Sequence, residues 1–470
     1  MKRVLIEGEW RETGEKFEVT APFSGEVLDM VCSAAKTDAE DAIHAAEAAA
    51  AEMRQFTREN ISKGLRRISA GIEEKSNEFA QTIALESGKP IAAARGEVGR
   101  AIATFALAAS EAERFAGEMI PLDVQKGGEG KTGYTFRVPK GIIYGITPFN
   151  FPLNLVAHKV APALAAGNSI IIKPSEKTPL TSLLLGEVFL KSGLPKSALQ
   201  IVPMDVKYMD TILGDDRIKM ISFTGSDKIG WMLKEKCGKK AIALELGGNA
   251  PVIVDESADI ESTAAKTAVG AFVYSGQVCI SVQRVLLHEK IADEFSDRFL
   301  SKVKDLKSGD PMDEDTVLSS MIDEDAAVRA KGWVDEAVGA GAKLRCGGGR
   351  NGAFLEPTVL TDVDPEMRIV SEEAFAPVAV IERFKTFPDA VAMANQSRYG
   401  LQVGVFTENT ENIRIASRDL EYGGVIFNDS PTFRVDNMPY GGIKDSGFGR
   451  EGVKYAMEEM SEIKLIVIDS

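Results

Sequence analysis

From residue 141 onward the chain repeats one pattern, in which a short apolar segment is followed by a turn and then by a helical segment. The apolar segments predict strands at Gly141–Thr147, Ser169–Lys173, Ala198–Pro203, Lys219–Phe223 and Ala241–Glu245. Helices are predicted between them, for example at Leu153–Ala166 and Thr178–Lys191. Strands that are apolar along their whole length are buried on both faces, so this alternation predicts a parallel sheet with helices on both sides. Ligands bind such sheets at the carboxyl ends of the strands.

The segments before residue 141 are mostly helical. The first 35 residues predict short strands, and three helical regions follow at Asp38–Met53, Arg58–Leu85 and Ile91–Ala116. Thr37 or Asp38 is the expected cap of the first helix. The segment Thr132–Val138 alternates polar and apolar residues, which predicts a strand exposed on one face.

A second alternating region occupies the later half of the chain, with different spacing. Its predicted elements are the helices Ile260–Tyr274 and Ile291–Val303 and the strands Ser281–His288, Phe354–Leu360, Val378–Ile381 and Val403–Phe406, with a terminal strand at Ser461–Ser470. The chain has 470 residues, which is too long for one simple core, so we expect two or three domains. The chain contains no sequence repeat that would mark the boundaries between these domains.

The composition restricts the classes of partner. The chain carries 55 basic and 70 acidic residues, a formal charge of −15, which disfavours nucleic acid and anionic membranes as partners. No run of about 18 apolar residues occurs, so we expect no membrane span. The start lacks the apolar run of a signal peptide and the four cysteines form no CxxC pair, which favours the cytoplasm. Only three histidines occur, without an HxxxH pair, so no metal site is expected.

A thiol and a carboxylate provide the strongest chemical signal. Cys279 follows a Gly-Gln turn, and Glu245 begins the segment Glu-Leu-Gly-Gly at the end of a predicted strand. Such a pair can perform covalent acyl chemistry, because a thiolate attacks a carbonyl and a carboxylate activates the water that releases the product. The alternative is an inert buried cysteine and a glutamate that caps a turn.

Three further polar turns end predicted strands of the same sheet. The Asn150 amide lies between two prolines and can donate to a developing oxyanion, or it stabilises its own turn. Lys173 and Glu176 can hold ribose hydroxyls, or they form a surface pair. Gly225 and Ser226 open a helix, which suits a phosphate, although a complete GxGxxG is absent.

Seven motifs occur together in one order along the chain. They are PFNFP (148–152), KPSE (173–176), FTGS (223–226), ELGG (245–248), GQVC (276–279), EEAFAPV (372–378) and PYGGIKDSG (439–447). In this combination the chain resembles the aldehyde dehydrogenase superfamily over essentially its whole length. The resemblance implies NAD(P)-dependent oxidation of an aldehyde through a cysteine thiohemiacetal and thioester.

The resemblance also implies roles for individual residues. Cys279 is then the nucleophile, Glu245 the general base and Asn150, with the Cys279 N–H, the oxyanion site. Lys173 and Glu176 match the pair that holds the adenine-side ribose. The full set of implied cofactor-binding residues is Thr147, Pro148, Lys173, Ser175, Glu176, Gly225, Ser226, Gly247, Glu373 and Phe375.

The implied architecture is α/β with three parts. A Rossmann-like parallel-sheet cofactor domain comprises residues 1–120 and 140–247, and an α/β catalytic domain comprises residues 248–445. Residues 121–139 and 458–470 form a small β oligomerisation arm, which implies a homodimer or homotetramer. Two alternatives remain open here, namely a CoA-acylating aldehyde dehydrogenase and a non-catalytic dinucleotide-binding protein.

The sequence restricts the choice of cofactor and the class of aldehyde only partly. Glu176 accepts hydrogen bonds from a free 2′-hydroxyl and repels a 2′-phosphate, which favours NAD, while Lys173 offsets that charge and leaves NADP open. The segment 431–439 resembles members that act on lactaldehyde or on small anionic aldehydes. Arg434 is the leading candidate to bind an anionic tail, with Arg114 and Arg284 as further candidates. The alternative for Arg434 is a local pair with Asp436.

Overall fold

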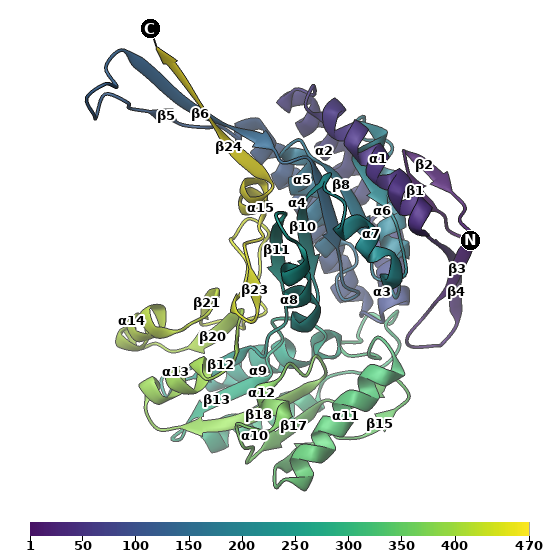
Figure 1. Ribbon diagram of the computed structural model, residues 1–470. Helices are drawn as coiled ribbons and strands as arrows, with labels where there is room; N and C mark the ends of the chain where they lie inside the picture. Colours follow the sequence, from purple (N-terminus) through teal and green to yellow (C-terminus); the bar gives the residue numbers. More distant parts are fainter. Residues whose placement is uncertain (470) are drawn as a thin grey trace.

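Two large sheets organise the chain, and a computed structural model describes residues 1–469 (Figure 1). The first sheet has eight strands, in the spatial order β2 (Glu9–Arg11), β1 (Val4–Ile6), β9 (Leu199–Ile201), β8 (Ser169–Lys173), β7 (Ile142–Ile146), β10 (Ile218–Thr224), β11 (Ala241–Glu245) and β23 (Gly447–Phe448). Strands β7 to β11 run parallel, whereas β23 lies antiparallel to β11 at the edge. The predicted parallel sheet is therefore confirmed, with a late segment added to its edge.

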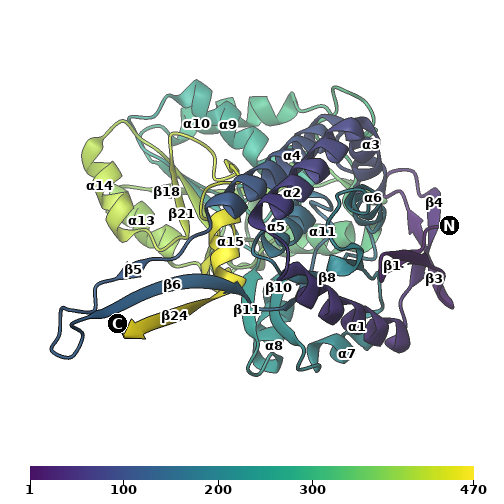
Figure 2. The ribbon, with the colours of Figure 1, turned by 90° about the horizontal axis from the view of Figure 1, so that it is seen from above.

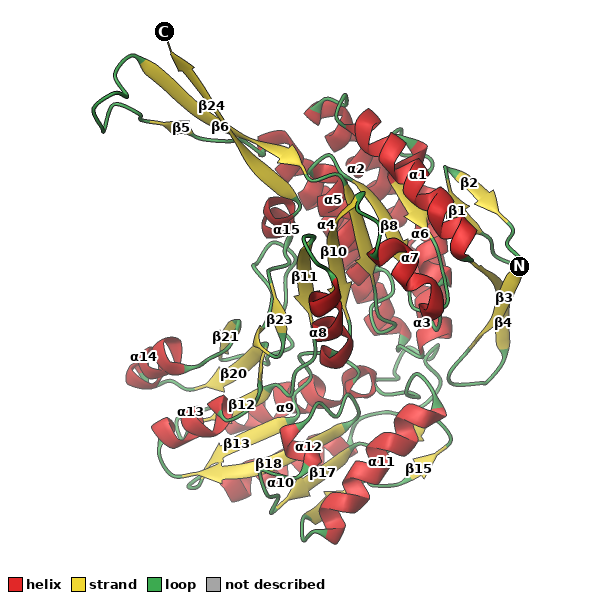
Figure 3. Ribbon diagram, in the orientation of Figure 1, coloured by secondary structure: helices red, strands yellow, loops and turns green. Residues whose placement is uncertain are grey.

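Helices cover both faces of this sheet (Figure 3). One face packs against α1 (Lys36–Met53), α7 (Met209–Leu213) and α8 (Asp227–Lys236). The other face packs against α2 (Arg58–Glu74), α3 (Ser76–Ser87), α4 (Ile91–Arg114), α5 (Asn154–Ala165), α6 (Leu180–Phe189) and α15 (Val453–Glu459). Because the strands are apolar on both faces, each layer of helices buries its own apolar core.

The second sheet has seven strands. Their spatial order is β14 (Lys343–Cys346), β17 (Thr358–Thr361), β18 (Val378–Phe384), β13 (Arg284–His288), β12 (Pro251–Val254), β20 (Gln402–Phe406) and β21 (Gly424–Phe427). Helices α9 (Ile260–Phe272) and α10 (Ala292–Lys304) cover one face, while α11 (Glu324–Gly339), α12 (Arg368–Ser371), α13 (Phe387–Asn395) and α14 (Thr410–Asp419) cover the other. All neighbouring strands except β14 and β17 run parallel.

A three-stranded arm projects from the body of the molecule (Figure 2). It consists of β5 (Met119–Ile120), β6 (Lys131–Pro139) and β24 (Ser461–Asp469), with β6 in the middle. Three two-stranded sheets complete the strands. Two are hairpins, namely β3 (Glu15–Thr20) with β4 (Val27–Ser33) and β15 (Arg350–Asn351) with β16 (Phe354–Leu355), and the third pairs the distant segments β19 (Tyr399–Gly400) and β22 (Ile443–Lys444). No helix within residues 1–469 is both long and apolar enough to span a membrane.

Two local predictions are wrong. The expected single helix Arg58–Leu85 is two helices, because Lys75 leaves the helical region with ψ at 18° and serves as the cap between α2 and α3. This break lets Ile72 and Phe79 enter the same core from two directions. The first helix begins at Lys36, two residues earlier than expected. Ala35 is its cap residue, and the Asp38 carboxylate accepts the Ala35 N–H at 2.8 Å from within the helix.

Candidate active site

The turn before Cys279 has an unusual backbone. Helix α9 ends at Phe272, and the next residues, Tyr274, Ser275 and Gly276, have φ values of 54°, 55° and 66°. A non-glycine residue in this left-handed region costs about 1–3 kcal/mol, so the surrounding structure must hold it there. Tyr274 donates its hydroxyl to the Ser87 carbonyl at 3.2 Å, and Ser275 donates to the Ser319 carbonyl at 2.6 Å. Packing, and not local preference, therefore sets the direction of the nucleophile turn.

Cys279 lies half-buried at the end of this turn. Its Sγ is 3.1 Å from the Tyr440 hydroxyl, and the Arg434 guanidinium stacks on the Tyr440 ring at 3.6 Å from the centroid. Burial raises the pKa of the Cys279 thiol to about 11, while the Tyr440 hydrogen bond and the Arg434 charge oppose that rise. The thiol is thus protonated at neutral pH in the free protein, and its two polar neighbours are placed to stabilise a thiolate.

Glu245 is the last residue of β11 and is only 4% exposed. Its Oε2 has no hydrogen-bond partner among residues 1–469. Burial raises its pKa well above the usual range, and the nearby Glu451 charge adds to this, while Arg434 opposes it. The Glu245 charge also raises the pKa of Cys279, and Arg434 acts on both groups. The structure therefore brings the carboxylate and the thiol into one site, on either side of Tyr440 and Arg434.

Asn150 reaches this site from the turn that follows β7 of the first sheet. It is buried, and its Nδ2 donates to the Gln277 carbonyl at 2.9 Å, two residues before Cys279. An amide nitrogen carries two donors, so one N–H of Asn150 is left for a ligand. The PFNFP turn and the nucleophile turn thus meet through a direct hydrogen bond between the two sheets.

A buried ionic network lies behind Glu245. The Lys159 ammonium pairs with Glu451 at 3.1 Å and donates to the hydroxyl of Thr224 at 2.7 Å. Arg434 also pairs with Glu451, at 3.2 Å. Despite burial, these cations hold the pKa of Glu451 below its usual range. Glu451 is therefore the ionised carboxylate of the site, and its charge favours the protonated form of Glu245 next to it.

The turns that follow β8 and β10 suit a dinucleotide. Lys173 ends β8 at 7% exposure, and its ammonium has no hydrogen bond or ion pair within the described residues, so it is available for ribose hydroxyls. Glu176 follows it, half-buried. Ser226 is the cap residue of α8, and its side chain makes no capping bond, which leaves the free N–H groups of the helix start for a phosphate.

The opposite wall comes from the catalytic sheet. Glu373 accepts a hydrogen bond from the Gly248 N–H at 3.0 Å, and burial raises its pKa to about 7. A Cβ at Gly247 would lie 2.2 Å from the Glu373 carboxylate, so only glycine permits this approach. The Phe375 ring packs edge-on against Phe149 at 5.8 Å. These residues fit a bound nicotinamide ribose, because a buried carboxylate with one free oxygen is available to accept its hydroxyls.

Comparisons with known proteins decide the family. The sequence matches the aldehyde dehydrogenase family over residues 10–466. The chain belongs to the aldehyde dehydrogenase family. Similar proteins include a 3-sulfolactaldehyde dehydrogenase of Priestia aryabhattai, 40% identical over 99% of this chain and 98% of the relative. A lactaldehyde dehydrogenase of Methanococcus aeolicus is 41% identical over 99% of this chain and all of the relative.

Solved structures of the family superpose closely on this aldehyde dehydrogenase. Aldehyde dehydrogenase 21 of Physcomitrella patens, in complex with the reaction product succinate, has a TM-score of 0.97 and 44% identity, covering 99% of this chain and 98% of the other. A glyceraldehyde-3-phosphate dehydrogenase, GapN of Methanocaldococcus jannaschii, complexed with NADP, has a TM-score of 0.93 and 41% identity, covering 98% of this chain and all of the other. The protein is therefore an oxidoreductase that oxidises an aldehyde with NAD(P)⁺, and the non-catalytic alternative is rejected.

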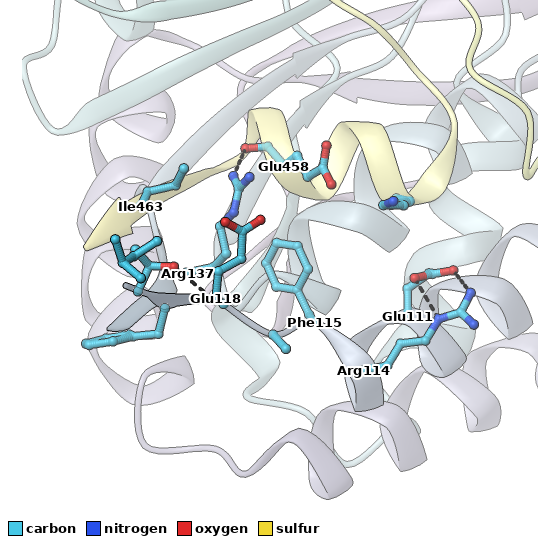
Figure 4. Close-up of a pocket in the computed structure, with 13 residues that line it drawn as sticks. Glu111, Arg114, Phe115, Glu118, Arg137, Glu458 and Ile463 are labelled. Carbon is cyan, nitrogen blue, oxygen red and sulfur yellow. Dashed lines mark hydrogen bonds and ion pairs between the residues drawn. The ribbon is translucent and has the colours of Figure 1, made fainter. Parts of the chain in front are cut away.

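Two of the three arginines proposed for the substrate lie elsewhere in this aldehyde dehydrogenase. Arg284 is buried in β13, where it pairs with both oxygens of Glu382 and donates to the Met393 carbonyl, so its donors are occupied. Arg114 is the last residue of α4, and its side chain is 72% exposed. It pairs with Glu111 and lines a cavity of about 760 Å³ at the base of the arm (Figure 4).

Arg434 does lie at the site, but its partner differs from the local alternative. Asp436 is paired with Arg100 at 2.7 Å and with His158 at 2.8 Å, so the proposed Arg434–Asp436 pair is absent. The side chain of Arg434 is 7% exposed, and its Nε has no hydrogen-bond partner among the described residues. A buried cationic donor without a partner is an available contact for a ligand anion.

Sequence reasoning missed the residues that surround the reacting pair. Tyr440 lay inside a recognised motif without a role, and Lys159, Glu451 and Arg100 were not singled out. The convergence of residues 100, 158, 434 and 451 has no local sequence signature.

Proposed function

We propose that this aldehyde dehydrogenase oxidises a small aldehyde with an anionic tail and releases the acid by hydrolysis. The observation that carries the hydrolytic route is the buried Glu245 carboxyl, whose charge, like that of Arg434, acts on both the Cys279 thiol and the Tyr440 hydroxyl. A carboxyl group with a raised pKa and one oxygen without a partner is suited to accept a proton from water.

The chemistry follows from these groups. The Cys279 thiol gives its proton to the ionised Glu245 carboxylate as its sulfur adds to the aldehyde carbon, and the resulting oxyanion is held by the free N–H of Asn150 and the Cys279 N–H. Glu245 releases this proton to solvent before the second half of the reaction. When bound, the nicotinamide accepts the hydride, which leaves an acyl thioester on Cys279. Glu245 then removes a proton from water as the water attacks the thioester carbon. The C–S bond breaks, the carboxylic acid leaves and the thiol is restored.

The hydrolytic route is tested against the CoA-acylating alternative by product analysis. With aldehyde, NAD⁺ and CoA all present, we expect the free acid as the product, because Glu245 is in place to activate water. Mass spectrometry of the product mixture distinguishes the acid from an acyl-CoA. A CoA-dependent acyl-CoA product would overturn this route.

Arg434 supports the anionic substrate. The Arg434 guanidinium is buried above the Tyr440 ring, and the Tyr440 hydroxyl contacts the Cys279 sulfur. The Nε of Arg434 has no hydrogen-bond partner within residues 1–469. The related proteins point the same way, since the names of two of them specify a sulfonated aldehyde and a succinate product. An anionic tail of a short aldehyde would therefore meet a fixed cationic donor.

Replacing Arg434 with leucine is expected to remove this preference. We expect the ratio of kcat/KM for 4-oxobutanoate over butanal to fall about 10- to 100-fold, the range for a charge-assisted hydrogen bond. The ratio is the relevant measurement, because Arg434 also pairs with Glu451 and its loss lowers turnover of both aldehydes. Arg434→Lys keeps a charge and should retain part of the preference. An unchanged ratio in Arg434→Leu contradicts the proposal.

The cofactor site supports NAD over NADP. Glu176 follows Lys173, and Asp205 is close enough that the charges of Lys173 and Asp205 shift each other's pKa. Two carboxylates beside the adenine-side ribose disfavour a 2′-phosphate, whereas the Lys173 ammonium permits some use of NADP.

We expect kcat/KM for NAD⁺ to exceed that for NADP⁺ by about tenfold, which corresponds to roughly 1.4 kcal/mol of charge repulsion at the ribose. Glu176→Gln keeps the size of the side chain and a hydrogen-bond acceptor but removes one charge, so it should lower the ratio of kcat/KM for NAD⁺ over that for NADP⁺. Steady-state assays with both cofactors measure it. An unchanged ratio in Glu176→Gln would show that this carboxylate does not set the preference.

The arm supports a homodimer or homotetramer. Strand β24 is an open edge of the arm sheet, and four of its apolar residues are about half exposed: Ile463, Leu465, Val467 and Ile468. Such an edge needs covering, and a second copy of the chain provides it. Analytical ultracentrifugation should give a multiple of 50.7 kDa. Leu465→Glu is expected to shift the mass to the monomer, while Lys464→Glu, which leaves the apolar residues intact, should not.

The two large sheets and the arm support a division of the chain into three parts, although β5 belongs to the arm sheet and β23 to the first sheet. We propose residues 1–120 and 140–247 as the cofactor domain, 248–445 as the catalytic domain and 121–139 with 458–470 as the arm. All four cysteines are free, which supports a reducing compartment such as the cytoplasm.

A further inference from the structure

A buried ion pair lies next to the proposed active site and includes none of the groups that react there. Lys89, between α3 and α4, pairs with Glu97 of α4, and their side chains are 1% and 0% exposed. An ion pair in the interior seldom adds stability over apolar residues of the same volume, because both charges lose their water. The position of this pair therefore calls for a role besides stability.

Glu97 contacts the turn that carries Asn150. Its Oε1 accepts the N–H groups of Leu153 at 2.9 Å and Asn154 at 3.1 Å. These are the first N–H groups of α5, and Leu153, the cap residue, offers no side-chain acceptor of its own. Glu97 thus caps α5 from a different helix and holds the chain three residues after Asn150.

Lys89 contacts both catalytic turns through their aromatic rings. Its ammonium lies 3.6 Å from the centroid of the Phe151 ring and 4.7 Å from that of the Tyr274 ring. Phe151 directly follows Asn150, and Tyr274 is the first left-handed residue of the nucleophile turn. Tyr274 is also bonded to the Ser87 carbonyl, two residues before Lys89. One buried cation therefore lies between a ring of the Asn150 turn and a ring of the Cys279 turn.

We propose that Lys89 and Glu97 are positioning residues that hold the Asn150 amide against the nucleophile turn. This inference rests on the proposed function, in which Asn150 and the Cys279 N–H bind the oxyanion. The contact they maintain is the 2.9 Å bond from Asn150 Nδ2 to the Gln277 carbonyl. Glu97 anchors the far end of the PFNFP turn, and Lys89 draws Phe151 and Tyr274 towards one point.

The first test replaces the cation. Lys89→Met keeps the length of the side chain, and we expect kcat to fall about 100-fold, as for a displacement on the order of 1 Å, with KM for the aldehyde and Kd for NAD⁺ nearly unchanged. Lys89→Arg keeps the cation over the rings and should recover kcat to within about tenfold of the parent. Lys75→Met, the same change at a partly exposed lysine that pairs with Glu78 and Glu187, is the matched control.

If Lys89→Met does not fold, the uncharged pair Lys89→Met/Glu97→Gln replaces it. The glutamine retains an acceptor for the two N–H groups, and no unpaired charge remains buried. The same loss of kcat is expected in this variant, because the cation between the rings is still missing. A parental kcat in the folded double variant overturns the inference.

A double-mutant cycle with Asn150→Ala separates positioning from general support of the fold. If Lys89 acts through Asn150, Lys89→Met has little further effect on kcat in the Asn150→Ala background. Effects that multiply, or a kcat loss that only follows a lower melting temperature, overturn the inference. If Asn150→Ala loses activity and Lys89→Met does not, the inference alone fails. If Asn150→Ala keeps full kcat, the proposed oxyanion site fails, and the inference fails with it.

Discussion

Cys279→Ala is expected to reduce aldehyde oxidation by at least about 10⁴-fold, because removal of a covalent nucleophile leaves only binding and oxyanion stabilisation. Cofactor binding should persist, since the groups that suit the dinucleotide, such as Lys173, Ser226 and Glu373, lie on other turns. NADH absorbance with a short aldehyde measures the loss, and fluorescence titration with NAD⁺ measures the binding.

The matched control is a second half-buried thiol in the catalytic domain. Cys346 lies in β14, and its Sγ contacts the Pro357 carbonyl and none of the groups around Cys279. Cys346→Ala should keep parental activity. If Cys279→Ala retains activity comparable with that of Cys346→Ala, the thiol is not the nucleophile and the covalent route is wrong.

Glu245→Gln is expected to stop the reaction after the hydride step. The glutamine is close in shape to the glutamate but cannot accept a proton from water, so the acyl thioester accumulates. We expect a rapid burst of about one NADH per active site, followed by turnover reduced roughly 10²- to 10⁴-fold. Stopped-flow absorbance records the burst, and intact-mass analysis detects the acyl group on Cys279.

The pH dependence provides an independent measurement of the same step. Burial raises the pKa of Glu245, so the fraction of base available to accept a proton increases with pH above the usual range of a glutamate. The deacylation rate of the parent should therefore rise with pH, and this dependence should be absent in Glu245→Gln. Glu235→Gln, an exposed residue of α8, is the control. Absence of a burst in Glu245→Gln, together with parental acid production, would contradict the assignment.

The strands of the first sheet could be predicted because burial on both faces leaves a clear signal. β8 and β11 begin and end where predicted, since each is a continuous apolar run that stops at a polar turn. Glu245 could also be proposed because it ends β11, whereas Cys279 follows α9 and was proposed from its Gly-Gln turn. Lys75 carries no such signal. A lysine is a good helix former, so nothing in its residue type indicates the break between α2 and α3.

The surroundings of the site could not be predicted from one sequence. Arg434 pairs with Glu451, which follows 17 positions later, and not with Asp436, which follows two positions later. The nearer partner is taken by Arg100, a residue 336 positions away. Short-range spacing cannot reveal such an exchange of partners, because it depends on which helices meet in the fold.

The strand β23 has a consequence for the evolution and engineering of this protein. Gly447 pairs with Glu245 and Phe448 with Leu244, so a two-residue strand from the late part of the chain closes one edge of a sheet whose other edge is β2, near the N-terminus. The first sheet is therefore not complete without β23, so the residues up to 247 do not form a separable unit. A chain that ends near residue 248 would lack β23, which would leave the edge of β11 unpaired, and it would also lack Tyr440 and Glu451. Recombination with other dinucleotide-binding proteins must therefore exchange both ends of the chain together. Circular permutation retains every strand of the sheet and is the less disruptive way to move the termini.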